Sequence, residues 1–277
     1  MAAPGFTVLR YEVAEGIATI TLDRPDVLNA FDRALKDELF AALKQAARDR
    51  VVRVVVITGE GRAFSAGQDL KERLPEHAAQ ADSPATRVPT RPTPLDQELR
   101  ERYNPIVLAI RAMEKPVIAA VNGVAAGAGM SLALACDIRM ASESASFTEV
   151  FGRVGLIPDT GSTWFLPRLV GPAKALELMW TTDPLDAPTA LALGLVNRVV
   201  PADRLVAETR ALAVRLSAAA PLALALAKRA VNRALEVGLV EALDYEASLQ
   251  GIAGRSADHA EGVRAFVEKR PPRFTGE

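Results

Sequence analysis

Cysteine and histidine are almost absent from this chain of 277 residues, which contains one cysteine and two histidines. A single cysteine cannot form a disulfide within the chain, a composition typical of reducing compartments. His77 and His259 stand far apart in the sequence, so we expect neither a metal site nor a Ser-His-Asp triad. Cys136 lies in an apolar run without a neighbouring base, and we expect it to be a small buried hydrophobic residue.

The chain also lacks an excess of charge of either sign and an uninterrupted membrane-length apolar run. Its net charge is −1, which argues against a nucleic-acid partner. Residues Met1 to Arg10 lack the basic-then-apolar pattern of a secretory signal, so none is expected. Val117–Cys136 is mostly small or apolar but contains Asn122 and three glycines, which predicts a strand, a turn and a buried helix instead of a membrane span. We therefore expect a cytoplasmic protein with no membrane partner.

The residue patterns that are present predict an α/β fold. Apolar runs and alternation repeat as strand–turn–helix units over residues 1–200, whereas 201–277 contain helical patterns alone. Strands are expected at Phe6–Val13, Gly16–Leu22, Arg53–Thr58, Pro116–Val121, Asp137–Ala141 and Leu195–Val200. Helices are expected after a cap at Asp32, over Leu95–Met113, from Met130, and over Asp203–Leu216, Pro221–Leu235, Leu239–Leu249 and Ser256–Val267. The proline-rich segment His77–Pro94 has no period and is predicted to be a loop. The C-terminal helices could form a subunit interface or pack within one monomer.

Two glycine-containing turns each follow a predicted strand, AFSAGQD at Ala63–Asp69 and NGVAAGAGM at Asn122–Met130. Small residues let a backbone approach a ligand closely, and the second turn leads into a helix whose first N–H groups are free. Two such N–H groups that met at one point would form an oxyanion hole. Neither turn has the spacing of a nucleotide-binding motif.

A lone carboxylate, Asp159, stands between an apolar run and a turn in GLIPDTGSTW. It could cap a helix that runs through Trp164 to Leu169. It could instead be a proton-transfer group whose pKa an apolar setting has raised. For two other acids a structural role is favoured, because Asp69 could cap a helix and Asp137 could be a buried hydrogen-bonding residue.

Several motifs together resemble the enoyl-CoA hydratase/isomerase (crotonase) superfamily. They are AFSAGQDLKE, KPVIAAVNGVAAGAGMSLALACDIRMASESASF, GLIPDTGSTWFLPRLVG, ALALGLVNRVVP and AFVEKRPPRF. The resemblance implies a crotonase-like spiral of ββα units over residues 1–200 and a C-terminal helical trimerisation region over 201–277. It implies a homotrimer or hexamer and an acyl-CoA thioester substrate. Coenzyme A would then be part of the substrate, with no separate cofactor.

The resemblance also assigns candidate catalytic residues. The backbone N–H groups of Gln68 and Ala128 would form the oxyanion hole that stabilises a thioester enolate. The two glutamates of the family's hydratases are missing, since Ser131 and Phe151 stand at their positions. The family's isomerases place their carboxylate at the position of Asp159, and PDTGSTWFLPRL is most similar to the ring-1,2-epoxyphenylacetyl-CoA isomerase subgroup. The chain is therefore expected to be an isomerase with Asp159 as acid and base.

Coenzyme A binding and the alternative functions follow from the same resemblance. The candidate substrate-binding residues are Arg24, Ala63, Phe64, Ala66, Asp69, Gly129, Phe266 and Lys269. The last two match positions that often reach coenzyme A from a neighbouring subunit. One alternative is a hydratase that uses Glu149, or less favourably Glu143, in place of the missing glutamates. Another is a non-catalytic scaffold that binds acyl-CoA or RNA, although the balanced net charge argues against RNA.

Overall fold

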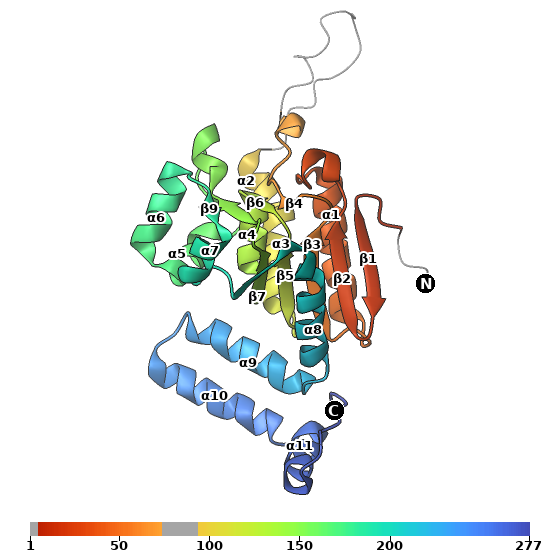
Figure 1. The fold of residues 1–277 in the computed structure, drawn as a ribbon. Helices are drawn as coiled ribbons and strands as arrows, with labels where there is room; N and C mark the ends of the chain where they lie inside the picture. The colour runs from red at the N-terminus through yellow and green to blue at the C-terminus, as the bar shows by residue number, and fades with distance from the viewer. Residues whose placement is uncertain (1–4, 74–93) are drawn as a thin grey trace, which may run out of the picture.

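A computed structural model describes residues 5–73 and 94–277 of the chain. Two sheets organise these residues (Figure 1). The larger sheet has the order β1-β2-β3-β5-β7-β10, in which β1 and β2 are antiparallel and the other pairs are parallel. Its strands are β1 Leu9–Ala14, β2 Ile17–Leu22, β3 Val54–Gly59, β5 Val117–Val121, β7 Ile138–Ser142 and β10 Arg198–Val200. The predicted segment His77–Pro94 lies outside the described residues except for Pro94.

A smaller sheet with the order β4-β6-β8-β9 lies beside the first. Its strands are β4 Ala63–Ser65, β6 Val124–Ala126, β8 Ser146–Thr148 and β9 Leu185–Asp186. In each repeat the first strand joins the larger sheet, the second joins the smaller one, and a helix follows. The pairs β3–β4, β5–β6 and β7–β8 follow this rule, which confirms the expected spiral of ββα units. The sequence patterns missed the strands of the smaller sheet because segments of two or three residues show no period.

Helices cover both faces of the larger sheet. The helices in chain order are α1 Arg33–Arg48, α2 Leu95–Glu98, α3 Asn104–Ala112, α4 Ala128–Ala135, α5 Ser162–Val170, α6 Pro172–Thr181, α7 Ala187–Ala192, α8 Leu205–Ser217, α9 Pro221–Ala234, α10 Leu239–Ala253 and α11 Ala257–Glu268. The main core joins the sheet to α1, α3 and α4. Leu205, Leu212 and Ala213 of α8 pack on the opposite face. As predicted, Asp32 caps α1, where its side chain accepts a hydrogen bond from the N–H of Leu35.

The helix predicted over Leu95–Met113 is divided into three parts. Between α2 and α3 the chain forms a π-helical turn at Leu99–Tyr103. Turns of this kind are rare and frequently occur at functional sites. The strand predicted at Leu195–Val200 is also shorter than expected, since only Arg198–Val200 pairs with β7, while Leu195 is buried in the core.

The C-terminal helices α9, α10 and α11 extend away from the sheets, and α9 and α10 lie side by side (Figure 1). The division of the chain at residue 200 stays a prediction, because α8, which follows that point, packs directly on the larger sheet. Among the described residues no single helix is long and apolar enough to cross a membrane. One pair, Ala202–Ser217 with Pro221–Ala234, reaches the required length and hydropathy together but is bent by 104°.

The prediction for Cys136 is confirmed, whereas Asp137 makes the predicted hydrogen bonds but is only partly buried. The Cys136 side chain is buried, and burial raises its pKa to about 12. Asp137 accepts a hydrogen bond from the N–H of Val117 at 2.8 Å and forms an ion pair with Lys228 at 2.7 Å. Asp137 therefore has the structural, hydrogen-bonded role that its position suggested.

Candidate active site

The candidate site lies where three parallel strands of the smaller sheet end. Strand β6 pairs in parallel with β4 on one side and with β8 on the other. The segments that follow these strands therefore emerge at the same edge of the sheet. This arrangement brings together the two glycine-containing turns and the segment Glu149–Phe151, although more than sixty residues separate the first from the last.

The two glycine-containing turns approach each other closely. A Cβ atom on Gly67, whose φ is +89°, would lie 2.7 Å from the carbonyl oxygen of Ala126 and 3.3 Å from the nitrogen of Ala128. Only glycine fits this approach without strain. Ala128 is the first residue of α4, so its N–H points out of the helix N-terminus. Neither the Gln68 N–H nor the Ala128 N–H donates a hydrogen bond to another described residue, as expected of two oxyanion-hole donors.

A cavity of about 250 Å³ opens beside these two residues. Its wall is mostly apolar, and it includes Gln68 and Ala128 together with Asp159. The other lining residues are Ala66, Gly67, Leu70, Leu95, Glu98, Leu99, Tyr103, Gly127, Val150, Phe151, Arg153, Val154 and Leu156. A carboxylate and two potential oxyanion donors thus face one small apolar cavity, which is a suitable arrangement for moving a proton next to a developing oxyanion.

Asp159 does not cap a helix, and the capping interpretation is therefore wrong. Helix α5 begins at Ser162, and its N-cap position is Gly161, which makes no side-chain hydrogen bond. The Asp159 carboxylate instead accepts a hydrogen bond from Thr160 Oγ1 at 2.8 Å. Burial raises the pKa of Asp159, and the Thr160 hydrogen bond partly opposes that rise. The carboxylate thus remains available to the cavity, with a proton affinity above that of an exposed aspartate.

The backbone around Asp159 is held in an unusual conformation. Thr160 is buried and has a φ of +53°, which is rare for a β-branched residue. Such conformations persist where surrounding contacts enforce them, and they are frequent at functional sites. One such contact comes from Ser131, whose hydroxyl donates to the backbone oxygens of Gly127 and Asp159, each at 3.1 Å. The Ser131 side chain thus joins the Asp159 segment to the turn between β6 and α4.

Phe151, which the family resemblance puts at the second glutamate position, lines the cavity. The alternative acid Glu149 lies nearby but does not line the cavity. Its Oε1 atom accepts a hydrogen bond from the Ser162 hydroxyl, and its buried Oε2 atom has no partner among the described residues. Burial, together with repulsion from Asp159, raises the pKa of Glu149 to about 7, although the Ser162 hydrogen bond opposes the rise.

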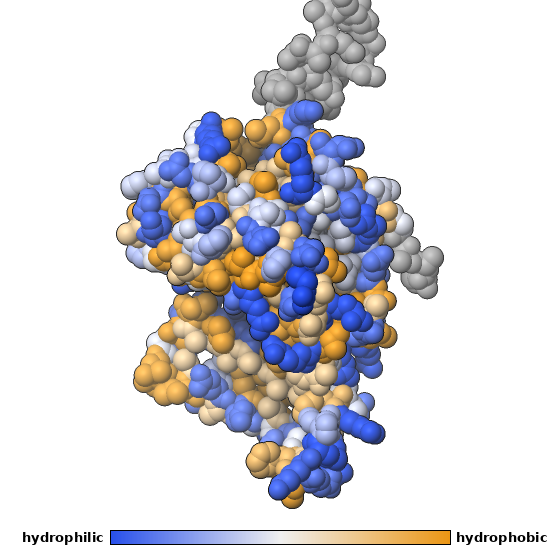
Figure 2. Space-filling view, viewed as in Figure 1, coloured by the Kyte–Doolittle hydropathy of each residue, from blue (hydrophilic) through white to orange (hydrophobic). Residues whose placement is uncertain are grey.

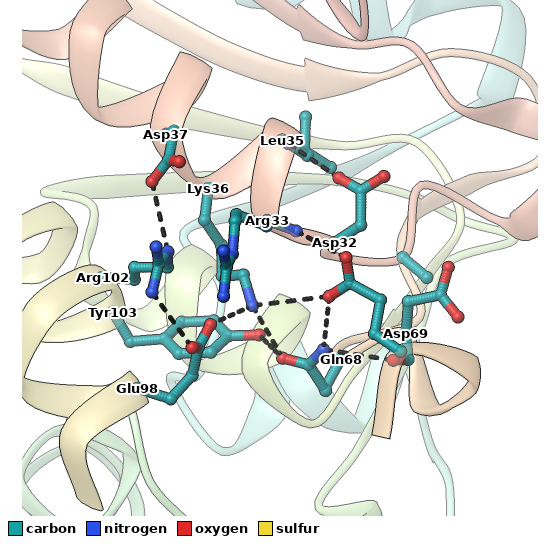
Figure 3. A network of polar contacts seen from close by, with 12 residues as sticks. Asp32, Arg33, Leu35, Lys36, Asp37, Gln68, Asp69, Glu98, Arg102 and Tyr103 are labelled. Carbon is teal, nitrogen blue, oxygen red and sulfur yellow. Dashed lines mark hydrogen bonds and ion pairs between the residues drawn. The ribbon is translucent and has the colours of Figure 1, made fainter. Parts of the chain in front are cut away.

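The side chain of Gln68 takes part in a buried polar network (Figure 3). Its Oε1 atom accepts hydrogen bonds from the Tyr103 hydroxyl at 2.7 Å and from Lys36 Nζ at 3.2 Å. Lys36 also forms an ion pair with Glu98 at 2.5 Å and lies over the Tyr103 ring, 5.0 Å from its centre. Glu98 pairs in turn with Arg102 at 3.2 Å. The network connects α1, α2 and the π-helical turn to the glycine-containing turn after β4, which carries Gln68.

The first group of predicted coenzyme A residues lies around the turn after β4. Ala66 lines the cavity. Ala63 and Phe64 are fully buried in the core. Asp69 Oδ1 accepts a hydrogen bond from the N–H of Lys71 and thereby caps a short 3₁₀ turn, as predicted. The other Asp69 oxygen pairs with Arg24, whose guanidinium also lies 3.1 Å from a carboxylate oxygen of Asp32, so two acids balance this positive charge.

The remaining predicted residues do not line the cavity. Gly129 is buried, and a Cβ atom there would lie 2.3 Å from the carbonyl oxygen of Ser65, so its position is set by packing. Phe266 and Lys269 belong to the end of α11, where the Phe266 side chain is 85% exposed. This helix lies at the far end of the molecule from α2 (Figure 1), so a single chain does not bring these two residues to the site.

Sequence reasoning missed Lys36, Glu98 and Tyr103. A signal for Lys36 was present, since it stands three residues before Leu39 and seven before Leu43, both on the buried face of α1. A lysine in that register is buried, and a buried lysine needs a partner. The partners Glu98 and Tyr103 could not be found in the same way, because only the tertiary structure brings α2 and the π-helical turn to α1.

A spiral of ββα units that presents two available amide donors and a half-buried carboxylate to one cavity fits a class of α/β enzymes that stabilise an oxyanion. The profile of the enoyl-CoA hydratase/isomerase family matches residues 12–277. The chain is 44% identical over 271 residues to a probable enoyl-CoA hydratase of Rhodobacter capsulatus, covering 98% of this chain and 99% of that protein. It is 43% identical over 266 residues to the 1,2-epoxyphenylacetyl-CoA isomerase of Escherichia coli, and the match covers 96% of this chain and 97% of that protein.

Solved structures agree with these sequence matches. An enoyl-CoA hydratase subunit from Geobacillus kaustophilus superposes with a TM-score of 0.86 at 39% identity, covering 98% of this chain and 99% of that one. The enoyl-CoA hydratase of Bacillus anthracis superposes with a TM-score of 0.87 at 33% identity, and the match covers 98% of this chain and 100% of that one. The chain belongs to the enoyl-CoA hydratase/isomerase family, whose members act on acyl-CoA thioesters.

Proposed function

We propose that this protein is an acyl-CoA isomerase in which Asp159 removes a proton from one carbon of the acyl group and returns it to another. The observation that carries the proposal is that Asp159 lines the same cavity as Gln68 and Ala128. The family resemblance in turn puts Ser131 and Phe151 at the positions of the two hydratase glutamates. One carboxylate is enough to move a proton between carbons. Water addition requires a second group that holds and deprotonates the water.

The two amides supply the larger part of the proposed catalysis. The α-proton of a thioester is too weakly acidic for an unaided carboxylate to remove. Stabilising the enolate oxygen lowers this barrier, and each oxyanion donor contributes about 3 to 4 kcal/mol. Positioned proton transfer by Asp159 adds roughly a hundred- to ten-thousandfold. The raised pKa of Asp159 suits this role, since a stronger base takes the proton more readily.

The substrate class follows from the cavity and from the relatives. Leu70, Leu95, Leu99, Val154 and Leu156 line the wall, which suits an apolar acyl chain or ring. The reaction is either a shift of a double bond or a rearrangement of a ring, through the same thioester enolate. The resemblance to the Escherichia coli isomerase supports the second reaction and a place in phenylacetate catabolism.

Several further features belong to the same proposal. Coenzyme A enters as part of the substrate along the turn after β4, and no separate cofactor or nucleic-acid partner takes part. Phe266 and Lys269 reach coenzyme A from a neighbouring subunit of a homotrimer or hexamer. The cell compartment is the cytoplasm, which the single buried thiol supports.

A hydratase that uses Glu149 as its second acid is the alternative. The observation that favours it is the electrostatic interaction between Glu149 and Asp159, which indicates two carboxylates close together. Against it, Glu149 does not line the cavity, and one of its oxygens is occupied by Ser162. The second acid would have to rotate toward the cavity before it could hold a water molecule.

Substitution of Asp159 by asparagine separates these functions. With a 3-enoyl-CoA as substrate, we expect Asp159→Asn to reduce kcat about a hundred- to ten-thousandfold while binding of a saturated acyl-CoA is retained. Because burial raises the pKa of Asp159, kcat/KM of the wild type should fall with acid at a higher pH than an exposed aspartate would give.

The matched control is Asp183→Asn, which changes an exposed aspartate and should leave turnover unchanged. Full isomerase activity in Asp159→Asn would exclude the proposal. Hydration of crotonyl-CoA that Glu149→Gln abolishes and Asp159→Asn does not would instead establish the alternative. Products are separated by liquid chromatography against isomer standards and detected by mass spectrometry.

A further inference from the structure

The side chain of Gln68 is anchored on both sides, although the oxyanion hole uses only its backbone N–H. Its carbonyl oxygen accepts from Tyr103 and Lys36, and its amide nitrogen donates to the backbone oxygen of Asp69 at 3.1 Å. The backbone at this point is held by two hydrogen bonds to Phe31, whose N–H donates to the Gly67 oxygen at 2.7 Å and whose oxygen accepts from the Asp69 N–H at 3.0 Å. The side-chain contacts add a further restraint on the orientation of the Gln68 peptide, from the side-chain end of the residue.

The lysine in this network is difficult to explain by stability alone. Lys36 has 1% of its side chain exposed, and its partner Glu98 has 8% exposed. Bringing such charges out of water is costly, and apolar replacements of a buried ion pair are often as stable or more stable. A methionine or leucine at position 36 would continue the apolar face of α1. Unlike an apolar side chain, Lys36 donates a hydrogen bond from its Nζ atom to the side-chain oxygen of Gln68 (Figure 3).

The other members of the network hold that donor in place. Tyr103 gives Lys36 a ring face at 5.0 Å and gives Gln68 a second hydrogen bond. The Glu98 carboxylate contacts Lys36 with one oxygen and Arg102 with the other. Because each carboxylate oxygen of Glu98 is paired with a cation, Glu98 has a structural role although it lines the cavity. In the proposed reaction, Asp159 is then the acid that faces the substrate.

We propose that Lys36, Glu98 and Tyr103 are positioning residues that hold the Gln68 side chain and thereby aim the Gln68 N–H at the thioester oxygen. This inference rests on the proposed function, since the thioester oxyanion is what the N–H serves. Oxyanion donors act through preorganisation, so a small misorientation weakens them. A displacement of about 1 Å can reduce turnover about a hundredfold.

Two variants test the inference in the full-length protein. Lys36→Met removes the charged donor and keeps the apolar length, whereas Tyr103→Phe removes one hydroxyl and keeps the ring. Lys44→Met is the matched control, because Lys44 also lies on α1 over an aromatic ring, at 5.0 Å from the centre of Phe40, but is exposed and outside the network.

Three measurements distinguish positioning from a merely structural role. We expect Lys36→Met to lower kcat about ten- to a hundredfold, and Tyr103→Phe to lower it less, with KM changed by no more than about twofold. The carbonyl stretch of a bound ¹³C-labelled thioester, measured by difference infrared spectroscopy, should move back toward its value in free solution. Amide hydrogen exchange at Gly67–Asp69 should accelerate in the protein without substrate. Lys44→Met should change none of these.

The outcomes separate this inference from the proposed function. If both variants leave kcat, the carbonyl stretch and amide exchange as in the wild type, the positioning role is overturned. It is also overturned if Lys36→Met loses only thermal stability while the carbonyl stretch of the bound ester is unchanged. If the wild type neither turns over nor polarises any acyl-CoA ester, the proposed function fails. Accelerated exchange at Gly67–Asp69 in the variants would then still support the anchoring of Gln68.

Discussion

Glu149 illustrates how a single buried group can control the response of this protein to pH. Its side chain has 1% of its surface exposed, and its Oε2 atom has no partner among the described residues. Burial raises the pKa of Glu149 from 4.5 to about 7. The folded protein therefore binds more protons than the unfolded chain between these two values, and its stability falls as the pH rises through that range.

The prediction at this scale concerns Glu149→Gln, which replaces the titratable carboxyl group by a neutral amide. Relative to this variant, the wild type should lose about 2 to 3 kcal/mol of unfolding free energy between pH 4.5 and 7. Urea unfolding across this range measures the difference. Glu177→Gln, at an exposed position, is the control and should follow the wild type. Parallel stability curves for Glu149→Gln and the wild type would show that Glu149 is ionised in the folded protein.

At the scale of the elements, Lys228 attaches α9 to the α/β core. Its Nζ atom donates to the Asp137 carboxylate at 2.7 Å and to the backbone oxygens of Ile110 at 2.8 Å and Lys115 at 3.3 Å. Asp137 in turn holds the first N–H of β5, at Val117. Lys228 thus joins α9 to the end of α3 and, through Asp137, to the start of β5.

We predict that Lys228→Met destabilises the protein by about 3 kcal/mol, because it leaves Asp137 partly buried without its nearest cation. Chemical unfolding at a single protein concentration measures the change. Lys174→Met provides the comparison, since Lys174 forms an exposed pair with Glu177 on α6 and should cost less than about 1 kcal/mol. Equal effects of the two substitutions would contradict the attachment role of Lys228.

At the scale of the whole molecule, the C-terminal helices expose a large apolar surface. Leu239 is 75% exposed, Val240 84%, Phe266 85% and Val267 73%. Figure 2 shows hydrophobic residues gathered over α9 and α10 below the core. Exposed apolar residues gathered on a helical surface often mark a contact with another protein, and the homotrimer or hexamer proposed above would cover those at the start of α10 and at the end of α11.

The corresponding prediction is that the protein in solution has the mass of three or six chains, measured by light scattering after size exclusion. The pair Leu239→Glu and Val240→Glu should shift this mass toward that of one chain, since it introduces charges into the apolar surface. Val51→Glu, at an exposed apolar position before β3, should leave the mass unchanged. A wild type with the mass of one chain would contradict the proposed assembly.

The sequence by itself determined the family, the order of the main strands and helices, and the turns that carry Gln68 and Ala128. The strands, helices and turns depend on local glycine placement and apolar periodicity, which short segments encode directly, whereas the family followed from the motifs that resemble it. It could not decide between a cap and an acid for Asp159, because the two interpretations differ only in what surrounds the carboxylate. It also missed β4, β6, β8 and β9, whose few residues have no pattern of their own, and the helices α6 and α7.

Only the tertiary structure decided these points. Parallel pairing of β4, β6 and β8 brings three distant turns to one edge, and the cavity there includes Asp159. The same packing buries Lys36 against Glu98 and Gln68. Desolvation and pairing depend on neighbours that are remote in the chain, so the pKa values of Asp159 and Glu149 and the network around Gln68 exist only in the folded molecule.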